Sequence, residues 1–171
     1  MMLRPEPTEN APFYAGYIAL VSDAGPVAAL EAQRAAIRRL ATLSEHEAEH
    51  RYAEGKWSVK ELLGHLADAE RVFAYRLLRI ARADKTPLAG FDENAWAEVA
   101  PHGRRTLAAV VDDLMAVRRA TITLVESLDD TSLDNVGVAN NTPVSARAIC
   151  WIVAGHAQHH LGILAERYGV Q

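Results

Sequence analysis

Apolar residues recur with a period near 3.6 over four stretches of the chain, and this spacing turns one face of an α-helix toward a core. The stretches cover approximately residues 26–43, 58–83, 105–128 and 143–168. Their lengths are those of the helices in an antiparallel bundle, where each apolar face packs against its neighbours. The pattern therefore predicts an all-α fold, a four-helix bundle.

Residues at the ends of these stretches have the chemistry of helix caps. Ser58 and Glu61 have the spacing of a capping box, in which each side chain accepts from the backbone N–H of the other residue. Thr142 is expected as the N-cap of the last helix, with Pro143 in its first position, and Gly169 is expected to end that helix. The caps predict where the helices start and stop.

The segments outside the helices differ in length. Residues 1–23 hold three prolines and are expected to form a packed N-terminal arm. Residues 84–104 form a long connection, with one helical turn expected around Trp96; a connection of this length is unusual in a compact domain and is often functional. Phe91 and Trp96 are expected to anchor a small core there, or alternatively to roof a site. We interpret residues 1–171 as a single domain.

Three histidines lie on the apolar stripes. His156 and His160 are one helical turn apart on the last helix, so their imidazoles project side by side. His65 falls on the buried face of the second helix. Three imidazoles on rigid helices can hold a metal ion and leave positions open for water or substrate. The alternative for each histidine is a hydrogen-bonded position in the core.

Polar residues near these histidines have two interpretations each. Asp68, one turn after His65, could accept a hydrogen bond from a ligand imidazole or be a solvated charge. His159 lies at the edge of its stripe and is expected as an outer contact of the site or at the surface. A polar set on the second helix favours surface ion pairing, with anion recognition or a dimer contact as the alternative: Glu70, Arg71, Tyr75, Arg76, Arg79 and Arg82.

The levels of the histidines along their helices predict the topology. At about 1.5 Å per residue, His65 lies about 10 Å from the start of its helix, and the midpoint of His156 and His160 lies about 15 Å from the end of theirs. The three rings meet most easily if the second and last helices are antiparallel. The long connection is then a crossover between parallel helices two and three, and the bundle is up-down-down-up, with its site nearer one end.

Composition excludes several classes of protein. The chain has 171 residues, of which 50% are hydrophobic and 23% charged, as in an ordered globular domain. The net charge is -4 and the basic residues are scattered, so no nucleic-acid surface is expected. No apolar run reaches membrane-spanning length and the first residues lack the order of a signal peptide, so a cytoplasmic location without membrane contact is expected. The single Cys150 excludes an internal disulfide.

The segments WSVKELLGHLADAER (57–71) and AGHAQHHLGILAERY (154–168) resemble the DinB-like superfamily, and the similarity extends over nearly the whole chain. The segment between them that runs from Glu70 to Trp96 and the N-terminal arm resemble one branch of it, the YfiT-type proteins. The resemblance implies a four-helix bundle in which one histidine of helix two and an HxxxH pair of helix four bind a divalent metal. Carried over position by position, the implied ligands are His65, His156 and His160.

The resemblance also implies a function. Some relatives resemble hydrolases, and others transfer low-molecular-weight thiols such as bacillithiol or mycothiol, so a small-molecule substrate is expected. Imidazole ligands suit zinc, nickel or iron. Related sequences often have an acidic residue after the first histidine of the pair, where this chain has Ala157, so no acid–base role carries over to that position. The alternative function is a non-catalytic metal-binding or stress-response bundle, and a homodimer is expected.

Overall fold

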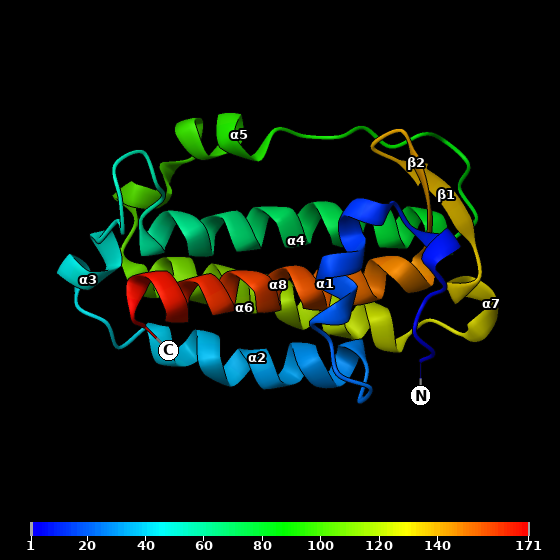
Figure 1. Cartoon of the computed structure of the whole chain (residues 1–171), viewed down its shortest axis with the longest axis horizontal. Coiled ribbons are helices and arrows are strands. Elements are labelled where there is room, and N and C mark those ends of the chain that lie inside the picture. Colours follow the sequence, from blue (N-terminus) through cyan, green and yellow to red (C-terminus); the bar gives the residue numbers. More distant parts are fainter. Residues whose placement is uncertain (1, 171) are drawn as a thin grey trace.

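Four long helices lie side by side along the length of the molecule (Figure 1). The computed structural model describes residues 2–170. The elements follow one another in the order η1 (Pro7–Glu9), η2 (Pro12–Tyr14), α1 (Ala15–Ala19), α2 (Pro26–Leu40), α3 (Glu45–Glu49), α4 (Val59–Ala81), α5 (Glu93–Val99), η3 (Pro101–Arg104), α6 (Leu107–Glu126), α7 (Asp130–Leu133), β1 (Val136–Ala139), β2 (Thr142–Ser145) and α8 (Ala146–Tyr168).

The long helices α2, α4, α6 and α8 confirm the predicted four-helix bundle and its topology. Helices α4 and α6 both start at the end of the bundle where α3 lies, whereas α2 and α8 start at the opposite end, beside the β-hairpin (Figure 1). The order is therefore up-down-down-up. The crossover between α4 and α6 contains α5 and η3 and runs back along the bundle (Figure 1).

Two of the predicted helix ends are confirmed in detail. The backbone N–H of Glu61 donates to Ser58 Oγ at 3.2 Å, and the N–H of Ser58 donates to Glu61 Oε2 at 2.7 Å, which is the capping box. Gly169 ends α8 with a φ of 69°, in the left-handed region that glycine adopts without strain. These caps fix the ends of the two helices that carry the histidines.

The predicted start of the last helix was wrong. Thr142 and Pro143 lie in strand β2, and α8 begins three residues later, at Ala146. Ser145 is the N-cap, because its Oγ accepts from the backbone N–H of Ala148 at 2.9 Å. A β-hairpin thus occupies the end of the expected link and the first three residues of the expected helix.

The hairpin forms because two asparagines occupy its turn. Asn140 and Asn141 have φ values of 51° and 60°, and two consecutive residues with positive φ make the turn whose twist matches paired antiparallel strands. The crossover joins this turn: Leu88 N–H donates to Val138 O at 2.9 Å, and Asn140 N–H donates to Leu88 O at 2.9 Å. One end of the crossover is therefore fixed to the hairpin.

The core consists of two apolar clusters, one toward each end of the bundle. Each long helix passes from one cluster to the other beside a buried polar residue. We call these residues the polar layer: Gln33 of α2, His65 and Glu70 of α4, Arg118 of α6 and His156 of α8. Buried polar groups require partners, so this layer is where chemistry other than packing is concentrated.

No helix within residues 2–170 combines the length and the apolar character needed to cross a membrane.

Candidate metal centre

The three histidines predicted from the apolar stripes meet at one level of the bundle. His65 of α4 faces His156 and His160 of α8, and one ring nitrogen of each lies within 4.8 Å of one in each of the others. The Nε2 atoms of His65 and His156 are 3.2 Å apart. Two imidazole nitrogens bound to one tetrahedral zinc ion would be about 3.3 Å apart, given metal–nitrogen bonds of about 2.0 Å. The donor set and its spacing fit one divalent ion.

Burial keeps these imidazoles neutral. It lowers the pKa of His65 to about 4 and the pKa of His160 to about 3, and it lowers the pKa of His156 well below its ordinary value. A neutral imidazole has the free lone pair that a metal ligand requires. The Nδ1 atom of His160 is buried without a hydrogen-bond partner among the described residues, so protein contacts alone do not satisfy the cluster.

The histidines line a cavity of about 270 Å³, the size of a site for a small molecule. A separate cavity of about 310 Å³ between α2 and α8 contains none of them, so the smaller cavity is the one that the chemistry favours. The wall of the histidine cavity is contributed by the N-terminal arm, the start and middle of α4, the crossover, the hairpin turn and α8: Phe13, Tyr14, Tyr17, Trp57, His65, Phe73, Arg76, Phe91, Glu93, Asn140, His156 and His160.

Aromatic rings hold the imidazoles in place. Trp57, which precedes the N-cap of α4, lies with its ring centroid 4.7 Å from that of His65. His156 has the ring of Tyr17 at 5.5 Å and that of Phe73 at 5.4 Å, both edge-on. Contacts of this geometry restrict the orientation of each ring. They also replace water with apolar surface on these sides of the cluster.

The N-terminal arm reaches the cluster because α8 has a glycine where α1 crosses it. A Cβ atom at Gly155 would lie 2.0 Å from the backbone oxygen of Tyr17, so only glycine allows this approach. The ring of Tyr17 also lies 5.3 Å from that of His159, which is half-buried beside His160. The structure therefore places His159 next to the cluster, on the side of α8 that contacts the arm.

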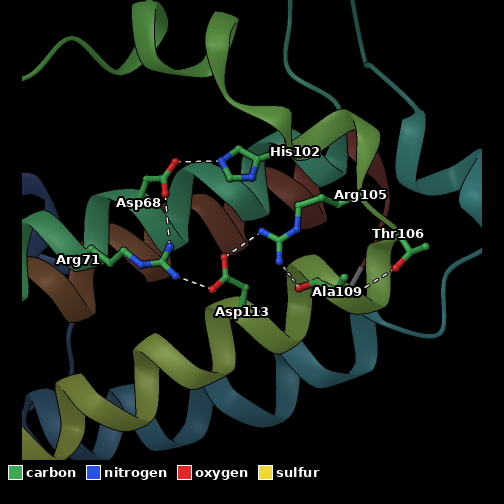
Figure 2. Close-up of polar contacts among 7 residues, drawn as sticks. All are labelled: Asp68, Arg71, His102, Arg105, Thr106, Ala109 and Asp113. Carbon is green, nitrogen blue, oxygen red and sulfur yellow. Dashed lines mark hydrogen bonds and ion pairs between the residues drawn. The ribbon is translucent and has the colours of Figure 1, made fainter.

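Asp68 forms hydrogen bonds with the crossover and with its own helix rather than with the cluster (Figure 2). Its Oδ2 lies 2.9 Å from His102 Nε2, and its Oδ1 pairs with Arg71 at 3.4 Å. Asp113 of α6 joins Arg71 to Arg105, whose Nη1 donates at 2.9 Å (Figure 2). This network fixes the second end of the crossover to α4 and α6, so that α5 lies over the cavity.

Sequence reasoning missed His102. Its ring is buried against Gly64, where a Cβ atom would lie 2.2 Å from His102 Cγ. Gly64 directly precedes His65, so the contact lies beside the cluster. The residues around His102 have no apolar stripe, and only the length of the crossover pointed to this region.

The family of the chain follows from comparison with known proteins. A model of the DinB superfamily matches residues 29–164. The chain belongs to the DinB superfamily. Two curated relatives carry the name "Putative metal-dependent hydrolase". One, from Oceanobacillus iheyensis, is 27% identical over 122 residues, which cover 70% of this chain and 69% of the relative. The other, from Bacillus pumilus, is 24% identical over 127 residues, with 72% and 71% covered.

Two solved structures share the fold of this chain over most of its length. YfiT from Bacillus subtilis, described as a probable metal-dependent hydrolase with an unusual four-helix bundle topology, has a TM-score of 0.73 at 18% identity and covers 99% of this chain and 95% of its own. A mycothiol-dependent maleylpyruvate isomerase has a TM-score of 0.67 at 15% identity, covering 90% of this chain and 63% of its own. At these identities the match establishes the fold.

Proposed function

We propose that this DinB-superfamily protein is a metal-dependent enzyme for a small substrate, a hydrolase or a transferase of low-molecular-weight thiols. His65, His156 and His160 would hold one divalent ion of zinc, nickel or iron. The observation that carries the proposal is the convergence of three neutral imidazoles on the wall of one small-molecule cavity. The names of the hydrolase relatives and of the mycothiol-dependent isomerase support it.

When bound there, the ion would supply a Lewis acid that polarises a carbonyl group or activates water or a thiol. The side chains of the cavity would orient the substrate and exclude bulk water. Ala157 offers no carboxylate beside the first histidine of the pair, but Glu93 of α5 lines the cavity. Burial and, after it, the charge of Glu93 raise the pKa of Tyr17. The ring of Tyr17 contacts that of His156, so the Glu93 carboxylate acts at the end of the cavity where the histidines lie. We assign to Glu93 the uptake of the proton that the attacking water or thiol releases.

Turnover by metal-loaded protein tests this function. Protein purified without a histidine tag is loaded with zinc, nickel or iron and assayed with esters, amides and thiol-transfer substrates. His65→Ala, His156→Ala and His160→Ala are each expected to lose turnover while the helical circular-dichroism spectrum is kept. His46→Ala is the matched control, because His46 is exposed on α3 and away from the cavity.

Two other outcomes of these assays are informative: one would contradict catalysis by the ion, and the other would favour the alternative function. Turnover retained in all three histidine variants would contradict the catalytic role of the ion. Metal binding that raises the melting temperature without any turnover would favour the non-catalytic metal-binding bundle, since a ligand that binds only the folded state stabilises it. Homodimerisation stays a prediction, and sedimentation over a range of concentrations tests it.

A further inference from the structure

The histidine cavity contains a buried cation without a counter-charge. Three lysine or arginine side chains among residues 2–170 are buried: Lys60, Arg76 and Arg118. Lys60 pairs with two carboxylates of α3, and Arg118 pairs with Glu70. Arg76 is 4% exposed and has no carboxylate of the described residues at ion-pairing distance. A buried charge without a partner is costly, so its presence calls for an explanation.

The protein contacts of Arg76 use only part of its hydrogen-bonding capacity. Its Nη2 donates to the backbone oxygen of Ala89 at 2.6 Å, and the guanidinium carbon lies 5.8 Å from the centre of the Phe91 ring. The phenol of Tyr14 lies beside it. A guanidinium has five N–H donors, so others remain available on the cavity side. Burial lowers the pKa of Arg76, as expected where no anion offsets the lost hydration.

Arg76 lies on the same face of α4 as His65. Eleven residues separate them, which is close to three full turns and roughly 16 Å along the helix. Helical side chains lean toward the N-terminus of their helix, so Arg76 extends toward the histidines. Both residues line the cavity, with Phe73 between them. Glu93 acts electrostatically on His65, so the negative charge belongs to the histidine end and the positive charge to the other end.

We propose that Arg76 binds the carboxylate of the substrate, whose reacting group then lies at the histidine cluster. This specificity role rests on the proposed function. A planar guanidinium pairs with a carboxylate through two parallel hydrogen bonds, and a single cation suits a monoanion. Glu93 would repel the same anion in the reverse orientation. The substrate class is therefore a small, elongated monocarboxylate with its reactive group at the opposite end.

Binding of hexanoate and of neutral hexanamide to the metal-free protein tests this role, with two-dimensional NMR titration as the readout. Hexanoate is expected to bind about 10- to 100-fold more tightly than hexanamide, with shifts at residues of the cavity. Arg76→Gln is expected to remove this preference. Arg82→Gln makes the same change of charge at the exposed C-cap of α4 and is expected to keep the preference.

Equal affinity for acid and amide, or an unchanged preference in Arg76→Gln, would overturn the proposal. If Arg76→Gln does not fold, Arg76→Lys decides: it keeps the charge but loses the paired donors, so a preference reduced below that of the wild type supports the role and an unchanged one contradicts it. The titration uses metal-free protein, so its result does not depend on metal binding. A protein that prefers hexanoate but binds no metal in a separate experiment would refute the proposed function and support the role of Arg76.

Discussion

Two groups of buried polar residues include members of the polar layer, but only one of the groups is matched within the protein. The first is centred on Arg118, which donates from Nε and Nη2 to Glu70 at 2.8–3.0 Å. Its Nη1 donates to Gln33 Oε1 at 2.9 Å and to the backbone oxygen of Leu30 at 3.2 Å. Gln33 in turn donates to the backbone oxygen of Ala154 at 2.9 Å. Charge and hydrogen bonds are matched within the protein.

The histidine cluster and its cavity are the second group, and two of its members are not fully matched within the protein. Nδ1 of His160 is buried without a hydrogen bond in the described part of the chain, and Arg76 has no carboxylate there. The comparison shows how a structural polar group can be told from a functional one in the same fold. Residues that satisfy each other stabilise the bundle, whereas residues left unsatisfied around a cavity point to a ligand.

The largest effect is expected from breaking the complete group. Arg118→Met leaves the carboxylate of Glu70 buried, at 3% exposure, without its partner. We expect the free energy of unfolding to fall by about 3–5 kcal/mol, measured by urea denaturation. The double variant Glu70→Gln, Arg118→Met removes both charges and should recover much of this loss. A loss below about 1 kcal/mol in the single variant would show that the pair is not matched as described.

A small effect is expected from the incomplete group. His160→Leu replaces an imidazole whose Nδ1 has no partner by an apolar side chain of similar size. In the metal-free protein at pH 7 the free energy of unfolding should change by less than about 1 kcal/mol, because no buried hydrogen bond is broken. A loss above about 2 kcal/mol would mean that His160 is a structural residue like Arg118.

The same variant should reduce the acid sensitivity of the metal-free protein. The folded pKa of His160 is about 3, below the unfolded value near 6.5, so between these values the unfolded state binds more protons and stability falls as the pH falls. From pH 7 to pH 5 one such histidine lowers the free energy of unfolding by about 2 kcal/mol. Urea denaturation at both pH values should show a smaller decrease in His160→Leu than in the wild type. An equal decrease would contradict the shifted pKa.

The sequence was sufficient for the bundle, its topology and the position of the histidines. Apolar stripes locate the faces of long helices, and two histidines one turn apart on a stripe must project together. The levels of His65 and of the midpoint of His156 and His160 then favoured an antiparallel arrangement of α4 and α8. Each of these inferences depends on helix geometry alone, which is nearly independent of tertiary contacts.

Sequence reasoning was weaker where the burial of a residue depends on contacts with more than one neighbouring element. Glu70 and Arg76 were expected at the surface, but α4 packs on both α6 and α8, so more of its circumference is buried than one stripe indicates. Anion recognition was the alternative considered for that polar set. The hairpin before α8 was missed because Thr142 and Pro143 were interpreted as the start of the helix, although they lie in β2. The turn that precedes them, at Asn140 and Asn141, was interpreted as part of a link.

The most direct test of the account is the metal content of protein purified without a histidine tag, measured by elemental mass spectrometry. We predict about one divalent ion per chain in the wild type and in the control His46→Ala, His50→Ala, which changes two exposed histidines. The double variant His65→Ala, His156→Ala should contain none. A wild-type protein that binds no metal after reconstitution with zinc, nickel and iron, or a double variant with the same metal content, would contradict the metal centre.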